Sequence, residues 1–140
     1  MTTLFLSAVL AAFTLPALAD IQKVAATGSV AEVTDALEAA VTNAGATVFA
    51  RVDHAAGAMK VGMDLNDAQL LVFGNPKLGT PAMQQDPLAG LYLPLRVLIY
   101  SADGATWLAY EDPADMFDGI AVDPASDVVG KMQGALKKLT

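Results

Sequence analysis

The residues best suited to chemistry lie between residues 48 and 81, in the stretch VFARVDHAAGAMKVGMDLNDAQLLVFGNPKLGTP. Asp53 and His54 close a pattern in which apolar and polar residues alternate, and Asn75 and Lys77 follow the apolar run LLVF. Both patterns are typical of strands that end in polar residues. Because binding and catalytic groups often lie on the loops that follow strands, this stretch predicts a functional site.

His54 is the only histidine of the chain, and an imidazole next to the carboxylate of Asp53 is a natural candidate for a general base. Adjacent residues on a strand point to opposite faces, however, and an aspartate that caps a helix already accepts hydrogen bonds from backbone amides. A structural role for His54 is therefore favoured. No serine lies in a G-x-S-x-G context, and no catalytic residue is predicted.

Residues 74–80, GNPKLGT, resemble a phosphate-binding loop only in their glycine spacing. Lys77 precedes the second glycine instead of following it, and Pro76 removes one amide, so nucleotide hydrolysis is not expected. A weaker anion site remains open, in which Lys77 and the amides of a helix that starts after Thr80 hold a small anion or carboxylate. The alternative is a plain turn at Asn75 followed by a helix cap at Thr80.

Metal chemistry has little support in the sequence. Met59 and Met63 lie four residues apart after His54, a set that could bind Cu(I) through thioethers, although methionines at this spacing are more often core residues. One histidine and no cysteine leave too few ligands for a zinc or iron site. No metal site and no cofactor are predicted.

Two arginines are predicted within strands, Arg51 and Arg96. A guanidinium in such a position needs a carboxylate partner, for which Asp53 and Glu111 are candidates, or it lines a pocket for an anionic ligand. Tyr110 lies near these strands and could form part of the wall of such a pocket.

The elements that must position these residues are marked by capping and turn residues. Ser29 and Glu32 form a capping box for a helix that ends near Gly45. The further elements expected are strands at 21–27, 47–53 and 69–73, a short helix at 54–63 capped by Asp53, short helices starting at Thr80-Pro81, Asp86-Pro87 and Asp112-Pro113, a hairpin of residues 95–101 and 106–111, and a final amphipathic helix from Asp127. The prediction is one α+β domain, with a mixed or antiparallel sheet of about five strands packed on one side by two longer amphipathic helices, plus short helices.

The first nineteen residues, MTTLFLSAVLAAFTLPALA, form an apolar run that ends in the small-x-small pattern of a signal peptidase site. This predicts cleavage after Ala19, a folded domain at 20–140, and a periplasmic or secreted location without membrane insertion. Fifteen acidic against eight basic residues give a net charge of −7, and the basic residues are scattered, which excludes nucleic acid as a partner.

Four segments, VFARVDHAAGA, LLVFGNPKLGTPAM, LPLRVLIY and WLAYEDP, occur in this order and together resemble the bacterial and archaeal family known as domain of unknown function 302. The resemblance covers residues 27–139. It implies a small α+β fold, often dimeric, and it implies no established activity. The signal segment resembles an addition found on exported members.

Together these observations favour a non-enzymatic domain of the cell envelope that binds a small anionic ligand or an envelope protein, as a homodimer. The predicted ligand site consists of His54, Asn75, Lys77, Arg96 and Tyr110. The first alternative is an enzyme that uses His54 as general acid or base while Arg51 or Arg96 holds an anionic substrate. The second alternative is a Cu(I)-handling protein.

Overall fold

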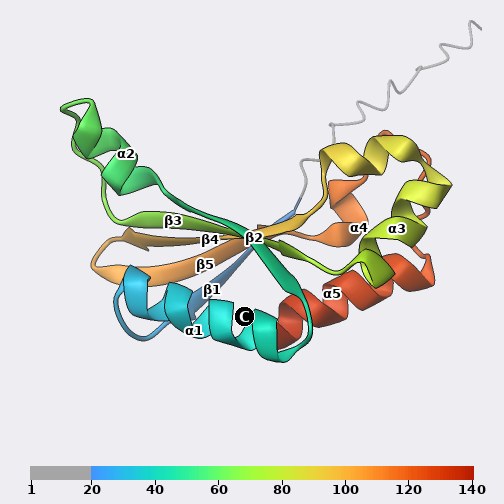
Figure 1. The fold of residues 1–140 in the computed structure, drawn as a ribbon, viewed down its shortest axis with the longest axis horizontal. Coiled ribbons are helices and arrows are strands. Elements are labelled where there is room, and N and C mark those ends of the chain that lie inside the picture. The colour runs from blue at the N-terminus through green and yellow to red at the C-terminus, as the bar shows by residue number, and fades with distance from the viewer. Residues whose placement is uncertain (1–19) are drawn as a thin grey trace, which may run out of the picture.

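The computed structural model describes residues 20–140, so the predicted signal segment lies outside the described residues. Five antiparallel strands form one sheet in the order β1-β5-β4-β3-β2 (Figure 1). The strands are β1 Ile21–Ala26, β2 Thr47–Asp53, β3 Ala68–Gly74, β4 Leu95–Ala102 and β5 Ala105–Glu111. The helices are α1 Val30–Asn43, α2 His54–Lys60, α3 Pro76–Gln85, the 3₁₀ helix η1 Pro87–Leu91, α4 Pro113–Met116 and α5 Asp127–Leu139. This is the predicted α+β domain.

The two longer amphipathic helices, α1 and α5, lie on the same face of the sheet, as predicted (Figure 1). Helix α1 connects β1 to β2, which are the two edge strands, and it therefore crosses the whole face. It begins with the predicted capping box, in which the amide of Glu32 donates to Ser29 Oγ and the amide of Ser29 donates to Glu32 Oε2. The helix ends before Gly45, which has the positive φ of 78° that favours glycine.

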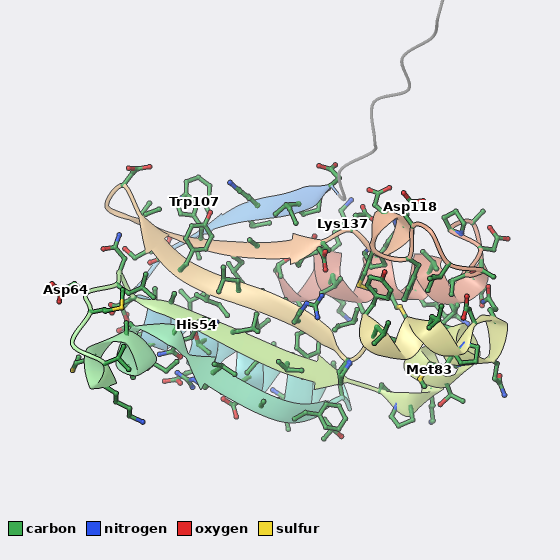
Figure 2. The ribbon with its side chains drawn as sticks, turned by 90° about the horizontal axis from the view of Figure 1, so that it is seen from above. His54, Asp64, Met83, Trp107, Asp118 and Lys137 are labelled. Carbon is green, nitrogen blue, oxygen red and sulfur yellow. The ribbon has the colours of Figure 1, made fainter. Side chains whose placement is uncertain are left out.

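Alternate residues of the strands separate the two faces of the sheet. The face toward α1 and α5 carries the buried core residues Leu71, Val97 and Ile99. We call the opposite side the open face, because no helix within residues 20–140 crosses it between α2 at one end and α3 at the other (Figure 2). By register, the central residues of the open face are Leu70, Val72, Leu98, Tyr100, Trp107 and Ala109.

The short elements follow the predicted caps with one exception. Asp53, Asp86 and Asp112 cap α2, η1 and α4 through their side chains, as expected. The prediction of a helix that starts at Thr80-Pro81 is wrong, because α3 starts five residues earlier, with Asn75 as its cap and Pro76 at its first position. Thr80 and Pro81 lie inside this helix.

Candidate functional site

A pocket of about 450 Å³ lies at the end of the sheet where β3 leads into α3. Segments that are distant in sequence form its walls: the end of α1, the beginnings of β2 and β4, α3, the loop after η1, and the C-terminal half of α5. Its larger side chains are apolar and include Phe49, Leu78, Met83, Leu93, Met132 and Leu139. The pocket exists because the sheet brings these elements to one end.

Local sequence explains how the wall formed by α3 is placed. Asn75 leaves β3 in an extended conformation, and its side chain accepts a hydrogen bond from the amide of Lys77 at 3.0 Å. Pro76 has no amide to satisfy at the first helical position, so α3 starts directly at the strand end. The side-chain Nδ2 of Asn75 also donates to the backbone carbonyl of Gly45 at 3.4 Å, which ties α3 to the end of α1. Asn75 is therefore a structural corner of the pocket.

The lining of the pocket is uncharged and mostly apolar. No charged side chain is among its lining residues, and its polar side chains are Asn75 and Thr80. Pockets that bind small molecules are mostly apolar, with a few polar groups that orient the ligand, and they measure roughly 300–1,000 Å³. The arrangement suits a small and largely apolar molecule better than the small anion expected from the sequence.

Of the five residues predicted to form one site, only Asn75 lines this pocket. Lys77 is exposed on α3 and lines a separate hollow that also contains Asp127 and Lys131. The Nζ of Lys131 lies 2.6 Å from Asp127 Oδ2, so that hollow already contains a paired carboxylate. The anion site predicted at a helix start after Thr80 is not formed. Thr80 lies in the interior of α3, where the backbone amides are not free to bind an anion as they are in a first turn.

His54 lies at the other end of the sheet. The register pairs Asp53 with Gln69 and Thr47 with Gly74, so the end of β2 is next to the start of β3, whereas Asn75 follows the end of β3. His54 occupies the first position of α2, is exposed, and has no side-chain hydrogen bond or ion pair within residues 20–140 (Figure 2). It shares no pocket with Asn75 or Lys77.

Arg96 and Tyr110 lie on opposite faces of the sheet. Arg96 belongs to the open face, where its Nη2 lies 3.1 Å from Glu111 Oε2, the partner that the sequence suggested. Tyr110 is half-buried and packs against the core on the face of α1 and α5. The structure therefore does not gather the five residues around a common ligand.

Arg51 has carboxylate partners other than the predicted Asp53. Its Nη1 contacts Asp35 and lies 3.3 Å from Glu38 Oε2, both on α1, and its Nε donates to Gln69 at 2.7 Å. The hydrogen bond with Asp35 is the main cause that raises the pKa of Arg51. The guanidinium of Arg51 therefore links β2 to α1 through the two carboxylates and to β3 through Gln69.

The methionines considered for copper lie on α2 and just after it, where Met59 is 77 % and Met63 66 % exposed. Core packing, the alternative to copper binding that the sequence favoured for these two methionines, is therefore wrong. Among residues 20–140, no group of three or more His, Cys, Asp and Glu side chains is placed to hold a metal ion.

The pocket wall formed by α3 and η1 is held by one carboxylate. Asp86 accepts hydrogen bonds from the amides of Ala121 at 2.8 Å and Leu88 at 2.9 Å. The hydrogen bond from the Ala121 amide, and after it the one from the Leu88 amide, lower the pKa of Asp86 below its usual value. Asp86 thus joins the turn between α3 and η1 to the loop that follows α4.

We expect Asp86→Asn to be less stable than the wild type at pH 7. A carboxyl group whose pKa is lowered by folding stabilises the fold above its unfolded pKa, and this contribution is lost as the pH falls through the lower, folded pKa. The difference between variant and wild type should therefore shrink as the pH is lowered through the acid range, which urea unfolding monitored by circular dichroism measures. Asp64→Asn is the control, because Asp64 is exposed in the loop after α2 and its side chain accepts no hydrogen bond within residues 20–140. A difference that does not depend on pH would contradict the role of the charge.

Sequence reasoning missed the apolar lining of the pocket because it searched for polar residues at strand ends. By sequence pattern, Phe49 belongs to a strand, Leu78 to the segment GNPKLGT and Met132 to the final amphipathic helix, and none of the three carries a polar group. A weak signal was present in the small residues that surround this end of the sheet, since small side chains leave space unfilled where elements meet. They are Ala44, Ala46, Gly74, Gly79, Gly90 and Ala135.

A solved structure with a similar fold is the crystal structure of an uncharacterized conserved protein DUF302 from Bacillus stearothermophilus. It superimposes with a TM-score of 0.76, covering 85 % of this chain and 94 % of that chain at 21 % sequence identity. At this identity the likeness establishes the fold alone.

Curated relatives include fluoride-specific ion channel FluC 1 of Brucella suis biovar 1 (strain 1330) and FluC 1 of Brucella abortus biovar 1 (strain 9-941). Each is 40 % identical to this chain over 104 residues, which is 74 % of this chain. The match spans about two fifths of those proteins, 41 % and 38 % respectively. None of the helices within residues 20–140 has the length and apolar character that crossing a membrane requires.

The family model described as "Domain of unknown function DUF302" matches residues 22–139, nearly all of the described chain. This agrees with the resemblance carried by the four sequence segments and with the similar fold. The chain belongs to the DUF302 family.

Proposed function

We propose that this protein is an exported, non-enzymatic binding domain that holds a small, largely apolar molecule in the pocket between α3, α5 and the end of the sheet. The uncharged, apolar lining of a pocket of about 450 Å³ is the observation that carries the proposal. A ligand there would gain free energy mainly by removing apolar surface from water, at about 25 cal/mol per Å². Thr80 and Asn75 would select a ligand with one polar end.

The absence of enzymatic activity is part of this proposal. A general base must come within hydrogen-bond reach of a substrate held in a cleft. His54 is exposed at the start of α2, away from the pocket, and the guanidinium groups of Arg51 and Arg96 are both paired with carboxylates. These placements give no support to the alternative in which His54 and an arginine act together on an anion.

Titration with N-phenyl-1-naphthylamine, a neutral apolar fluorophore, tests the ligand class. We expect saturable binding of one molecule per chain, with increased emission and a raised melting temperature. Sodium phosphate and sodium acetate, which represent small anions, should cause neither effect. Native mass spectrometry of the protein purified from its host envelope would then identify the natural ligand. Saturable binding of phosphate without binding of the fluorophore would contradict the proposal.

Export is the second part of the proposal, and it predicts that the protein recovered from the envelope begins at Asp20. The folded domain already involves this residue, because its carbonyl accepts a hydrogen bond from the amide of Asp112 at 3.0 Å. Cleavage after Ala19 would therefore leave the whole described fold intact. Intact-mass measurement and N-terminal sequencing check the prediction, and recovery of a chain that retains Met1 would contradict it.

The proposed working form is a homodimer. Its support at this point is the family resemblance, together with exposed apolar side chains on the sheet and on α2, among them Val52, Met59 and Ile21. Apolar residues gathered on one side of a sheet commonly mark a protein interface.

A second candidate function is that of a partner domain for a fluoride channel. It is favoured by the 40 % identity over 104 residues to proteins named fluoride-specific ion channels, of which the match covers only about two fifths. Segments of that identity share a fold, so those proteins are expected to carry a domain like this one beside their other parts. Co-expression with a fluoride channel from the same host, followed by co-purification and fluoride efflux assays with and without this protein, tests the candidate. Unchanged efflux and no co-purification would rule it out.

A further inference from the structure

The open face of the sheet is an apolar surface that no described element covers. Its central strands, β3 and β4, present Leu70, Val72 and Leu98, which are half-buried. At its two edges, Val52 of β2 is 40 % and Ile21 of β1 is 47 % exposed. A sheet face in a monomer surrounded by water usually carries polar residues at alternate positions, whereas the middle of this face carries mainly apolar ones.

Charge is nearly absent from the open face, although the chain carries a net charge of −7. Of the fifteen acidic residues, only Glu111 occupies an open-face position of a strand, and it is paired with Arg96 at 3.1 Å. Lys23 of β1 is the other charged residue on this face. Asp64 and Asp67, in the loop between α2 and β3, line a hollow with Leu98 and Tyr100 at one end of this face. The strands themselves add no further acidic side chain, so two copies that meet through the middle of their open faces keep most of their like charges apart.

The size of the open face fits a dimer interface. Five strands spaced about 4.8 Å apart, with about six residues each at about 3.4 Å per residue, give a footprint of roughly 24 by 20 Å. A standard interface buries about 800 Å² of accessible surface on each partner. The flat footprint of roughly 480 Å² is smaller, so the relief of the side chains and the neighbouring helix α2 must supply the rest. Helix α2 rises on the same side of the sheet as the open face (Figure 1), and the exposed Met59 and Val61 add apolar surface at this end.

We propose that two copies of this chain pack through their open faces about a twofold axis, with Leu98 near the centre and the Arg96–Glu111 pairs at the rim. This inference rests on the proposed homodimer and adds its interface. An interface with an apolar centre and charges confined to the rim has the usual anatomy of a stable contact. The two sheets would lie about 10 Å apart, the usual distance for sheets packed face to face.

A second copy fits this surface better than other occupants. Each copy offers one acidic side chain, Glu111, and two basic ones, Arg96 and Lys23. A twofold arrangement that sets Lys23 of one copy near Glu111 of the other would pair opposite charges twice. An anionic membrane surface would be repelled by the net charge of −7, and the face has no cluster of lysines or arginines that could overcome this repulsion.

The test starts with the mass of the wild type, purified as its host processes it, by size-exclusion chromatography with light scattering. We expect twice the mass of one chain at tens of micromolar. Trp107 is the only tryptophan and lies on the open face, so its emission should shift to longer wavelength as the dimer dissociates on dilution. Wild-type protein that remains monomeric would overturn both the homodimer and this interface.

A matched pair of variants then locates the interface. Ala109→Lys places a cation near the centre of the open face and should weaken dimerisation at least about 100-fold, because a buried charge without a partner costs several kcal/mol. Ala39→Lys adds the same charge on the exposed side of α1, on the opposite side of the sheet, and should leave the dimer intact. A dimer that tolerates Ala109→Lys, with Trp107 emission unchanged on dissociation, would overturn the interface while retaining the homodimer. If Ala109→Lys does not fold, the emission of Trp107 in the diluted wild type tests the interface alone. A shift to longer wavelength on dissociation supports the open face as the interface, and an unchanged emission overturns it.

Discussion

Gly79→Phe should weaken the binding of N-phenyl-1-naphthylamine by more than about tenfold while leaving the fold intact. Gly79 lies in α3 and lines the pocket, and a Cβ added there would have its nearest neighbour, Leu93 Cδ1, at an ordinary contact distance of 3.7 Å. Helix interiors favour other residues over glycine by about 1 kcal/mol, so the backbone tolerates the change. The added ring would occupy volume that the ligand needs, and its effect is read from fluorescence titration.

Gly134→Phe is the matched control for this experiment. Gly134 is an exposed residue of α5, and an added Cβ there meets no atom within 4 Å, so the same ring would point into solvent. This variant should bind the fluorophore as the wild type does. If both variants bind equally well, the apolar molecule does not occupy the pocket and the proposed function is wrong.

Phe117→Ala should lower the free energy of unfolding by about 3–5 kcal/mol, the usual cost of removing a large aromatic side chain from a core. Phe117 follows α4 and is 2 % exposed, and its ring packs edge-on against Tyr92 with a centroid distance of 5.9 Å. The variant loses this contact and leaves a cavity between η1 and the loop after α4. Urea unfolding at a fixed protein concentration measures the change.

Phe49→Ala makes the same chemical change at a side chain that is 57 % exposed. It should cost below about 1 kcal/mol, since most surface substitutions have small effects. Equal losses for the two variants would mean that Phe117 is not a core residue of the folded protein in solution.

The parts of the fold that depend on neighbouring residues were predictable from sequence. The capping box of Ser29 and Glu32 and the turn of the β4–β5 hairpin, with Asp103 and Gly104 at positive φ, both act within a few residues. The prediction at Thr80-Pro81 was wrong because Asn75-Pro76 offers the same signal five residues earlier. Pro81 is the sixth residue of α3, so it removes one helical hydrogen bond, a loss that the helix tolerates.

The candidate site was much less predictable, and the reason is the direction of the strands. His54 and Asn75 both follow strand ends. Because β2 and β3 are antiparallel neighbours, the end of β2 and the end of β3 lie at opposite ends of the sheet, measured along the strands. At about 3.4 Å per residue, a strand of this length separates them by roughly 20 Å. Only parallel strands would have brought both residues to the same end of the sheet. The pocket instead depends on contacts between α1, α3 and α5, which no local pattern encodes.

The two outer strands carry features that oppose polymer growth. An outer strand has a row of free backbone groups, to which a strand of another molecule can add and so extend a ribbon. In β2 the register shifts between Val48 and Ala50, and this irregularity bends the strand away from the flat geometry that such addition needs. In β1, Lys23 places a charge between apolar neighbours. Concentrated solutions of this protein should therefore resist the formation of amyloid-like fibres, even though the outer edges of β1 and β2 have no strand partner within residues 20–140.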